Sequence, residues 1–231
     1  MKSSPYISRS FILPVLVFVL AVSYGLFYFS QTSDIFHSSN EFTVILDAGH
    51  GGDDPGKVSA SGVKEKEINL AIALKCESIL KQNGIHVILS RNTDCSLEDA
   101  GVSNVKASDL KNRKLLITEN KPDCAVSIHQ NSFPDPAQHG AQVFYHPSNQ
   151  KGKLLASLIQ AQTVHLTAEE NTRKIKANSD YYLLRDNPIP TVIAEVCFLS
   201  NPSEAEMITD PSMQDKAAFA IAMGIMQYLY S

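Results

Sequence analysis

The sequence has no surplus of positive charge, and this absence narrows the range of possible partners. Its 20 Lys and Arg residues stand against 24 Asp and Glu residues, which leaves a net charge of -4 over 231 residues. The basic residues are scattered along the chain rather than clustered, so they supply no continuous basic surface for a nucleic-acid backbone. We therefore expect no nucleic-acid partner.

Charge is also absent from one long segment near the N-terminus. Residues 11–29 contain no charged side chain, and this length is enough for a helix to cross the hydrocarbon core of a bilayer. Because Lys2 and Arg9 precede the segment, we expect residues 1–10 to be cytoplasmic and the rest of the chain to face outward from the cell membrane. We predict an uncleaved, single-pass signal anchor. The alternative is a cleaved signal peptide, for which Ala21-Val22-Ser23 is a weak cleavage site.

Cysteine pairs at redox or metal-binding spacing are missing. Cys76, Cys95, Cys124 and Cys197 are widely separated, and no two of them form a Cys-x-x-Cys pair. In an exported domain they could form two disulfides, but a domain of this size does not need such crosslinks. Because Cys124 and Cys197 flank expected strands, small buried thiols are the favoured interpretation.

Short β runs alternate with helical periodicity from residue 41 to residue 231, after a polar linker over residues 30–40. The expected strands cover residues 43–46, 85–90, 125–129, 142–145 and 191–196. The expected helices begin at Glu65, near residue 153 and near residue 213, and another carries Arg113 after a surface loop over residues 94–108. This alternation predicts one α/β domain, with a mixed, mostly parallel central sheet flanked by helices.

Two of the expected strands end in a histidine. His50 follows the run Val44-Ile45-Leu46-Asp47-Ala48-Gly49, and His129 follows Ser127-Ile128. The strand ends deliver both imidazoles to the same end of one sheet, and a shared metal is the simplest reason for that arrangement. Phosphate binding is an alternative role for the glycine-rich turn that contains His50. The glycine spacing of the nucleotide-binding fingerprint and a Gly-Lys-Ser/Thr sequence are both absent, however.

Three acidic residues are candidates to complete such a site. A catalytic zinc usually takes three protein ligands, and both Glu65 and Glu67 lie at the opening of the first helix of the domain. Spacing alone does not choose between them, and a glutamate there also stabilises a helix N-terminus. Glu195 interrupts an otherwise apolar strand, where burial is costly unless the acid is paired or catalytic. Beside a metal it would be a general base, whereas a structural carboxylate is the alternative.

Four segments, taken together, resemble the ordered motifs of a known enzyme family. They are Val44 to Gly52, Lys64-Glu65-Lys66 with Asn69-Leu70, Ser127 to Asn131, and Glu195 with Phe198 to Pro202. Their order and sequence are similar to those of the zinc-dependent N-acetylmuramoyl-L-alanine amidases of the amidase 3 family. The resemblance implies that His50, Glu65 and His129 bind one Zn²⁺ per chain and that Glu195 is the catalytic acid/base. It thereby selects Glu65 over Glu67.

The resemblance also implies a substrate, which is peptidoglycan, and a reaction. Enzymes of this family hydrolyse the amide bond between N-acetylmuramic acid and L-alanine. The chain is most similar to the compact germination-type cortex amidases of Gram-positive spore formers, and an activating lipoprotein is a possible partner. Vegetative wall and spore cortex both stay open as the substrate. A catalytically silent peptidoglycan-binding module is the alternative, although such a module would lack a ligand or the glutamate.

Two further residues are expected to contact the substrate. Arg113 resembles an arginine of the family that could face the anionic peptide, with a solvated helix arginine as the alternative. Asn131 follows His129 by two positions and is the second candidate. The chain departs from the family at Cys197, because a glycine commonly stands two residues after the catalytic glutamate.

Overall fold

The computed structural model describes residues 9–35, 42–166 and 171–231. The chain divides into two compact units, Met1–Asn40 and Glu41–Ser231. The first unit contains helix α1, Arg9–Ile35. The second unit holds all the strands and the other helices of the described residues.

Helix α1 includes the segment for which a membrane anchor is predicted. Its side chains are described from residue 14 to residue 27, and the apolar ones from Val15 to Leu20 are exposed. Among the described residues, no helix has both the length and the apolar character that a membrane crossing requires. The predicted span over residues 11–29 extends beyond residues 14–27, whose side chains are described, and residues 1–8 and 36–41 lie outside the described part of the chain. The anchor is therefore not supported by the structure and stays a prediction.

One six-stranded sheet forms the centre of the second unit, in the order β2-β1-β3-β6-β4-β5. The strands are β1 (Thr43–Ala48), β2 (His86–Leu89), β3 (Cys124–Asn131), β4 (Gln142–Tyr145), β5 (Lys176–Ala177) and β6 (Thr191–Phe198). All neighbouring pairs are parallel except β4 with β6, which is antiparallel. The prediction of a mixed, mostly parallel sheet is confirmed.

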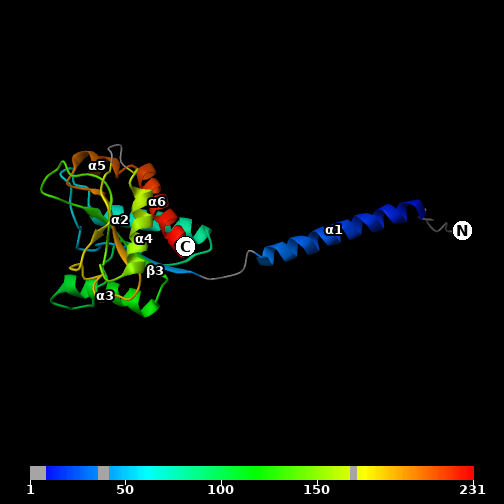
Figure 1. Ribbon diagram of the computed structural model, residues 1–231, viewed down its shortest axis with the longest axis horizontal. Helices are drawn as coiled ribbons and strands as arrows, with labels where there is room; N and C mark the ends of the chain where they lie inside the picture. Colours follow the sequence, from blue (N-terminus) through cyan, green and yellow to red (C-terminus); the bar gives the residue numbers. More distant parts are fainter. Residues whose placement is uncertain (1–8, 36–41, 167–170) are drawn as a thin grey trace. The chain divides into compact units, whose positions relative to one another are not determined.

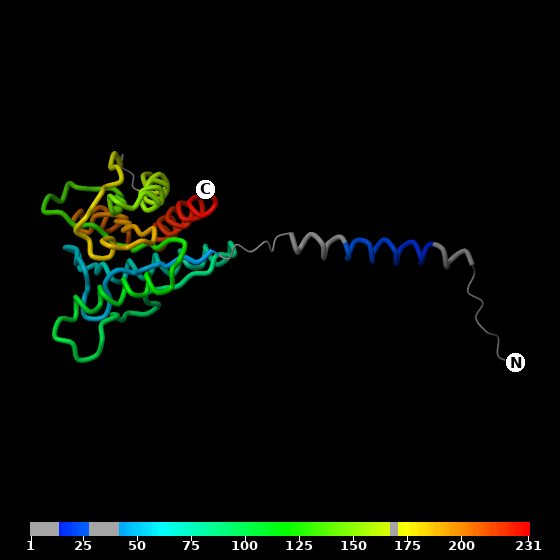
Figure 2. The backbone as a smooth tube through the Cα atoms, turned by 60° about the horizontal axis from the view of Figure 1, so that its bottom comes forward, coloured from blue at the N-terminus to red at the C-terminus, as the bar shows by residue number. Residues whose placement is uncertain are grey.

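Helices cover both faces of the sheet. They are α2 (Glu65–Gln82), α3 (Val105–Asn120), α4 (Gln150–Thr163), α5 (Pro202–Met207) and α6 (Pro211–Leu229). Side chains of α2, α4 and α6 share the main hydrophobic core with β1, β3 and β6. Ile117 of α3 packs on the opposite face, against Ile45 and Ala125. Figures 1 and 2 accordingly show α3 and α6 on opposite sides of the strands.

The alternation of side chains along the strands decides which polar groups lie together. Val44, Leu46 and Ala48 of β1 belong to the main core. Asp47 therefore points to the face covered by α3, and its ion pair with Arg113 of that helix agrees. By the same alternation Ser127 of β3 and Glu195 of β6 lie on the α3 face. A row of polar side chains thus crosses the carboxyl halves of three parallel strands, which is where open α/β sheets bind their ligands.

The predicted elements differ from the structure at three places. Helix α3 begins at Val105, inside the predicted loop over residues 94–108, because the Asn104 side chain accepts a hydrogen bond from the backbone N–H of Ala107 and caps the helix. Strand β5 and helix α5 are absent from the prediction. Buried thiols are confirmed at Cys76, Cys124 and Cys197, whereas Cys95 is exposed, and all four are free.

Candidate functional site

The loop after β1 carries His50 in a conformation that few non-glycine residues adopt. His50 has a φ of 62°, and Gly51 and Gly52 after it also have positive φ. Gly49 is required for a different reason: a Cβ atom there would lie 2.2 Å from the His129 ring. The backbone of this loop therefore passes directly against the second histidine, which brings the two imidazoles together. Their ring centroids are 4.9 Å apart.

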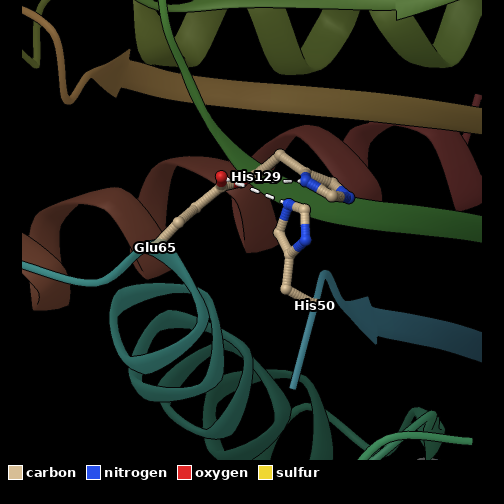
Figure 3. A group of neighbouring side chains, drawn as sticks. All are labelled: His50, Glu65 and His129. Atoms are coloured by element: carbon tan, nitrogen blue, oxygen red, sulfur yellow. Dashed lines mark hydrogen bonds and ion pairs between the residues drawn. The ribbon is translucent and has the colours of Figure 1, made fainter. Parts of the chain in front are cut away.

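Glu65, the first residue of α2, points its carboxylate at both histidines (Figure 3). Its Oε2 is 3.2 Å from His50 Nε2, and its Oε1 is 2.9 Å from His129 Nδ1. One ligand atom from each of the three residues lies within 4.8 Å of the others, close enough to hold one metal ion. The structure thus brings together all three residues of the predicted ligand set. Glu67, the alternative that spacing left open, is exposed and pairs with Lys64.

The charges within this cluster favour an ionised carboxylate. Burial alone would raise the pKa of Glu65, but hydrogen bonds and charge from His129 and His50 hold it well below its ordinary value. Burial alone would lower the pKa of His50, yet Glu65 and then Asp54 raise it to about 9. Asp54 Oδ2 lies 2.8 Å from His50 Nδ1 and fixes the orientation of that ring. A carboxylate behind a ligating histidine is the usual way in which proteins orient it.

Behind Glu65 lies a buried network of polar side chains. Asn69, one helical turn after Glu65, donates its Nδ2 to Glu65 Oε1 at 3.3 Å and to the Gly49 carbonyl at 3.1 Å. Gln130 donates its backbone N–H to Glu65 Oε1 at 3.0 Å and its Nε2 to Asn69 Oδ1 at 3.1 Å. The Cys197 thiol donates to Gln130 Oε1 at 3.1 Å. Cys197, which departs from the family pattern, is therefore part of the hydrogen-bond network that holds Glu65 in place.

Three cationic side chains hold the carbonyl groups of the His50 loop. Arg91 donates to the carbonyls of Ala48 and Gly49, at 2.9 and 3.1 Å. Lys66 Nζ donates to the Gly52 carbonyl at 2.6 Å. Arg113 donates to the carbonyls of Ala48 and His50, both at 2.8 Å. The positions of these carbonyls, and hence of His50, are set by side chains from three distant segments.

Acceptors from within the protein surround Arg113, the first predicted substrate contact. Its side chain is buried, so it is not a solvated helix arginine. Besides the loop carbonyls, it donates to Asp47 Oδ1 at 2.5 Å and to Asp109 Oδ2 at 2.7 Å. All three guanidinium nitrogens therefore already have protein acceptors, and a substrate carboxylate would have to compete with them. The geometry supports positioning of the loop rather than substrate binding.

Glu195 is the fourth residue of the predicted site, and the register of β3 with β6 pairs it directly with His129. It is only 9% exposed, and its Oε2 is buried without a hydrogen-bond partner. Burial raises the pKa of Glu195 to about 7, an effect that the nearby histidines partly oppose. A buried carboxylate oxygen without a hydrogen-bond partner destabilises the folded state. A bound group that supplied this partner would remove the cost.

A cavity of about 300 Å³ opens beside these residues. Its walls include His50, His129, Glu195, Ser127 and Tyr181. Arg113 also reaches this cavity, but Asn131 is not among its lining residues. The Asn131 side-chain oxygen instead accepts the backbone N–H of Ser132 at 2.8 Å. The expected substrate contact by Asn131 therefore has no support from this geometry.

Several residues of the site had no predicted role. Arg91, Lys66, Asn69 and Gln130 all act on backbone or carboxylate groups from segments far away in the sequence. Lys66, Asn69 and Gln130 lie inside the four family motifs, so the motifs were a signal for these three residues. Arg91 follows a predicted strand directly, but nothing in the sequence identifies the carbonyls that it binds.

Comparison with known proteins gives the same result as the motifs. A family described as N-acetylmuramoyl-L-alanine amidase matches residues 44–227. The germination-specific N-acetylmuramoyl-L-alanine amidase of Bacillus subtilis (strain 168) is 37% identical over 188 residues, which cover 80% of this chain and 78% of that protein.

Solved structures agree with the sequence relatives. The CwlD amidase of Clostridioides difficile, solved in complex with the GerS lipoprotein, has a TM-score of 0.78 and 41% identity, covering 82% of this chain and 98% of that one. The catalytic domain of CwlV, an N-acetylmuramoyl-L-alanine amidase from Bacillus (Paenibacillus) polymyxa, has a TM-score of 0.72 and 35% identity, with coverage of 82% and 98%. The chain therefore belongs to the family of N-acetylmuramoyl-L-alanine amidases.

Proposed function

We propose that the chain is a zinc-dependent amidase that cleaves the bond between N-acetylmuramic acid and L-alanine in peptidoglycan. One observation carries the proposal. The ligand atoms of His50, Glu65 and His129 lie within 4.8 Å of one another, and Glu195 lines the same cavity as the two histidines. This arrangement combines a metal-binding set with a separate carboxylate that is available for proton transfer.

The residues present fit a zinc ion. Two imidazoles and one carboxylate form a ligand set that hydrolytic zinc enzymes use, and it leaves a position for water or substrate. Asp54 behind His50 and the Asn69–Gln130 network behind Glu65 supply the outer support that such ligands need. The unpartnered Oε2 of Glu195 is the second indication that the site is built to receive a further group.

Glu195 is the residue that moves protons in this proposal. A zinc ion held by His50, Glu65 and His129 would act there as a Lewis acid for the scissile carbonyl and for water. Glu195 accepts a proton from the water that attacks the carbonyl carbon and returns it to the nitrogen of the departing L-alanine. One C–O bond forms and the C–N bond breaks, so the glycan and the stem peptide separate.

The names of two relatives are the basis for proposing a particular form of peptidoglycan as the substrate. The Bacillus subtilis relative is named as germination-specific. The Clostridioides difficile relative was solved in complex with a lipoprotein. For this chain we propose a role in germination, with cortex peptidoglycan as the substrate, and a lipoprotein partner. A silent peptidoglycan-binding module is disfavoured because all four active-site residues are present and grouped.

The test is digestion of purified peptidoglycan by the purified chain, with mass spectrometry of the products. The proposal expects glycan fragments with free lactyl groups and peptides with free N-terminal L-alanine. A chelator should abolish release, and added zinc should restore it. Vegetative and cortex peptidoglycan are compared side by side, and faster release from cortex supports the germination role. Hydrolysis at a different bond, or undiminished activity after complete metal removal, would refute the proposal.

The location of the catalytic unit is a separate proposal that rests on sequence alone. The uncharged segment over residues 11–29, with Lys2 and Arg9 before it, supports a membrane anchor with the catalytic unit outside the cell. Protease added to intact protoplasts should digest residues 41–231. Protection of that unit from the protease, or its recovery only as a shortened soluble form, would contradict the proposed membrane anchor.

A further inference from the structure

Tyr181 lies in the segment between β5 and β6, held in place by hydrogen bonds on both sides. The Asn178 side-chain oxygen accepts the backbone N–H groups of Asp180 and Tyr181, at 2.7 and 2.9 Å. The Tyr181 carbonyl accepts the backbone N–H of Leu184 at 3.0 Å. This turn fixes the Cα–Cβ direction of Tyr181 and directs the side chain over the sheet.

The ring of Tyr181 packs on the same sheet face that carries Glu195. It forms a T-shaped pair with the Phe144 ring, with centroids 5.4 Å apart and planes at 89°. It also packs against the small core that Phe144 forms with Ile193. Ile193 and Glu195 are two residues apart on β6, so their side chains point to the same face. Tyr181, Ile193 and Glu195 accordingly line one cavity.

The hydroxyl of Tyr181 has no hydrogen-bond partner among residues 42–166 and 171–231. Glu195 Oε2, in the same cavity, has none either. Burial, followed by the negative charges of Glu195 and Glu65, raises the pKa of the Tyr181 phenol to about 12. The phenol therefore keeps its proton at neutral pH and is a hydrogen-bond donor. The cavity thus presents one unused donor and one unused acceptor.

We propose that the Tyr181 hydroxyl donates a hydrogen bond to the carbonyl oxygen of the scissile amide and is a catalytic residue of this enzyme. The inference rests on the proposed amidase function. The carbonyl oxygen of an amide can accept a hydrogen bond from the phenol. During cleavage, the amide nitrogen can accept the proton that Glu195 carries. The carbonyl oxygen gains negative charge as its carbon becomes tetrahedral, so the hydrogen bond strengthens in the transition state. Tyr181 forms and breaks no covalent bond.

The test compares Tyr181→Phe with a matched tyrosine variant of the full chain. Tyr181→Phe removes only the hydroxyl and keeps the ring that packs on Phe144. The control is Tyr228→Phe, which makes the same chemical change on α6, near Cys124 at the opposite end of β3 from His129. Steady-state kinetics on peptidoglycan fragments, zinc content and melting temperature are measured for wild type and both variants.

Tyr181→Phe should lower kcat by on the order of 10²-fold, the typical effect of removing one donor to a developing oxyanion. KM, zinc content and melting temperature should stay near the values of Tyr228→Phe. The inference is overturned if kcat of Tyr181→Phe lies within twofold of that control. It is also overturned if zinc is lost in parallel with activity, because Tyr181 would then support the metal ligands. An inactive wild type would instead refute the proposed function itself.

Discussion

His129 and Glu195 are directly opposite each other on the neighbouring parallel strands β3 and β6. This pairing places Glu195, the proposed acid/base, next to His129, a proposed metal ligand, through backbone hydrogen bonds of the sheet rather than through a loop. A shift of one residue in either strand would turn one of the two side chains to the opposite face of the sheet. The relative position of the two side chains is therefore set by the strand register.

The histidines should be needed for zinc but not for folding. His50→Ala or His129→Ala in residues 41–231 should abolish stoichiometric zinc binding, because each removes one of three ligands. His86→Ala is the matched control, since His86 is exposed at the start of β2. Zinc is measured by atomic emission and folding by circular dichroism. Full zinc content in both histidine variants would show that the ligand assignment is wrong.

Asn69 should affect zinc affinity without touching the metal. Asn69→Ala removes the hydrogen bonds to Glu65 Oε1 and to the Gly49 carbonyl. Loss of such outer support typically weakens metal binding by about 10- to 100-fold. Competition with a zinc chelator gives the Kd. Asn83→Ala is the control at the C-cap of the same helix, because the Asn83 side chain donates to the Ile79 carbonyl, far from Glu65. Equal Kd values for the two variants would contradict the role of the network.

The buried pair of Asp47 with Arg113 should contribute stability that depends on pH. The Asp47 pKa lies at about 2 rather than 3.8: burial opposes this shift, but Arg113 and the Ser127 hydroxyl outweigh it. A carboxyl whose pKa is lowered by folding stabilises the native state above its unfolded pKa and loses that contribution as pH falls towards 2. The contribution is about 2 kcal/mol.

Asp47→Asn measures this contribution. The variant should be clearly less stable than wild type at neutral pH, because the buried Arg113 then keeps only Asp109 as an anionic partner. The difference in unfolding free energy should narrow by about 2 kcal/mol between pH 5 and pH 2. Urea unfolding across this range gives the values, and Asp215→Asn, a change at an exposed aspartate, is the control. A difference that stays constant with pH would show that Asp47 is not the titrating group.

Sequence patterns were sufficient for the parts of the fold that repeat locally. Strand β1 is a β-branched run, and α2 has an apolar face that ends at Asn83-Gly84, so both were predicted from one segment each. Strand β5 has two residues and α5 has six, which is too short for a periodic signal. The two histidines followed from their strands, whereas the choice of Glu65 depended on the family motifs.

Long-range contacts explain what the sequence did not reveal. The charge of Arg113 was visible, but its acceptors lie on Asp47, Asp109 and the His50 loop, and only the folded chain brings them together. The same holds for Arg91, which binds carbonyls more than 40 positions earlier in the chain. Tyr181 enters the cavity from the segment before β6, and no periodicity connects it with Glu195.

The central claim is that metal binding and proton transfer are performed by different residues. Glu195→Gln tests it most directly, because the side chain keeps its size but can no longer accept the proton of water. Zinc content and muropeptide release are measured on the same preparation. The account predicts near wild-type zinc and a fall in turnover of at least about 10²-fold. Retained turnover, or joint loss of zinc and activity, would contradict it.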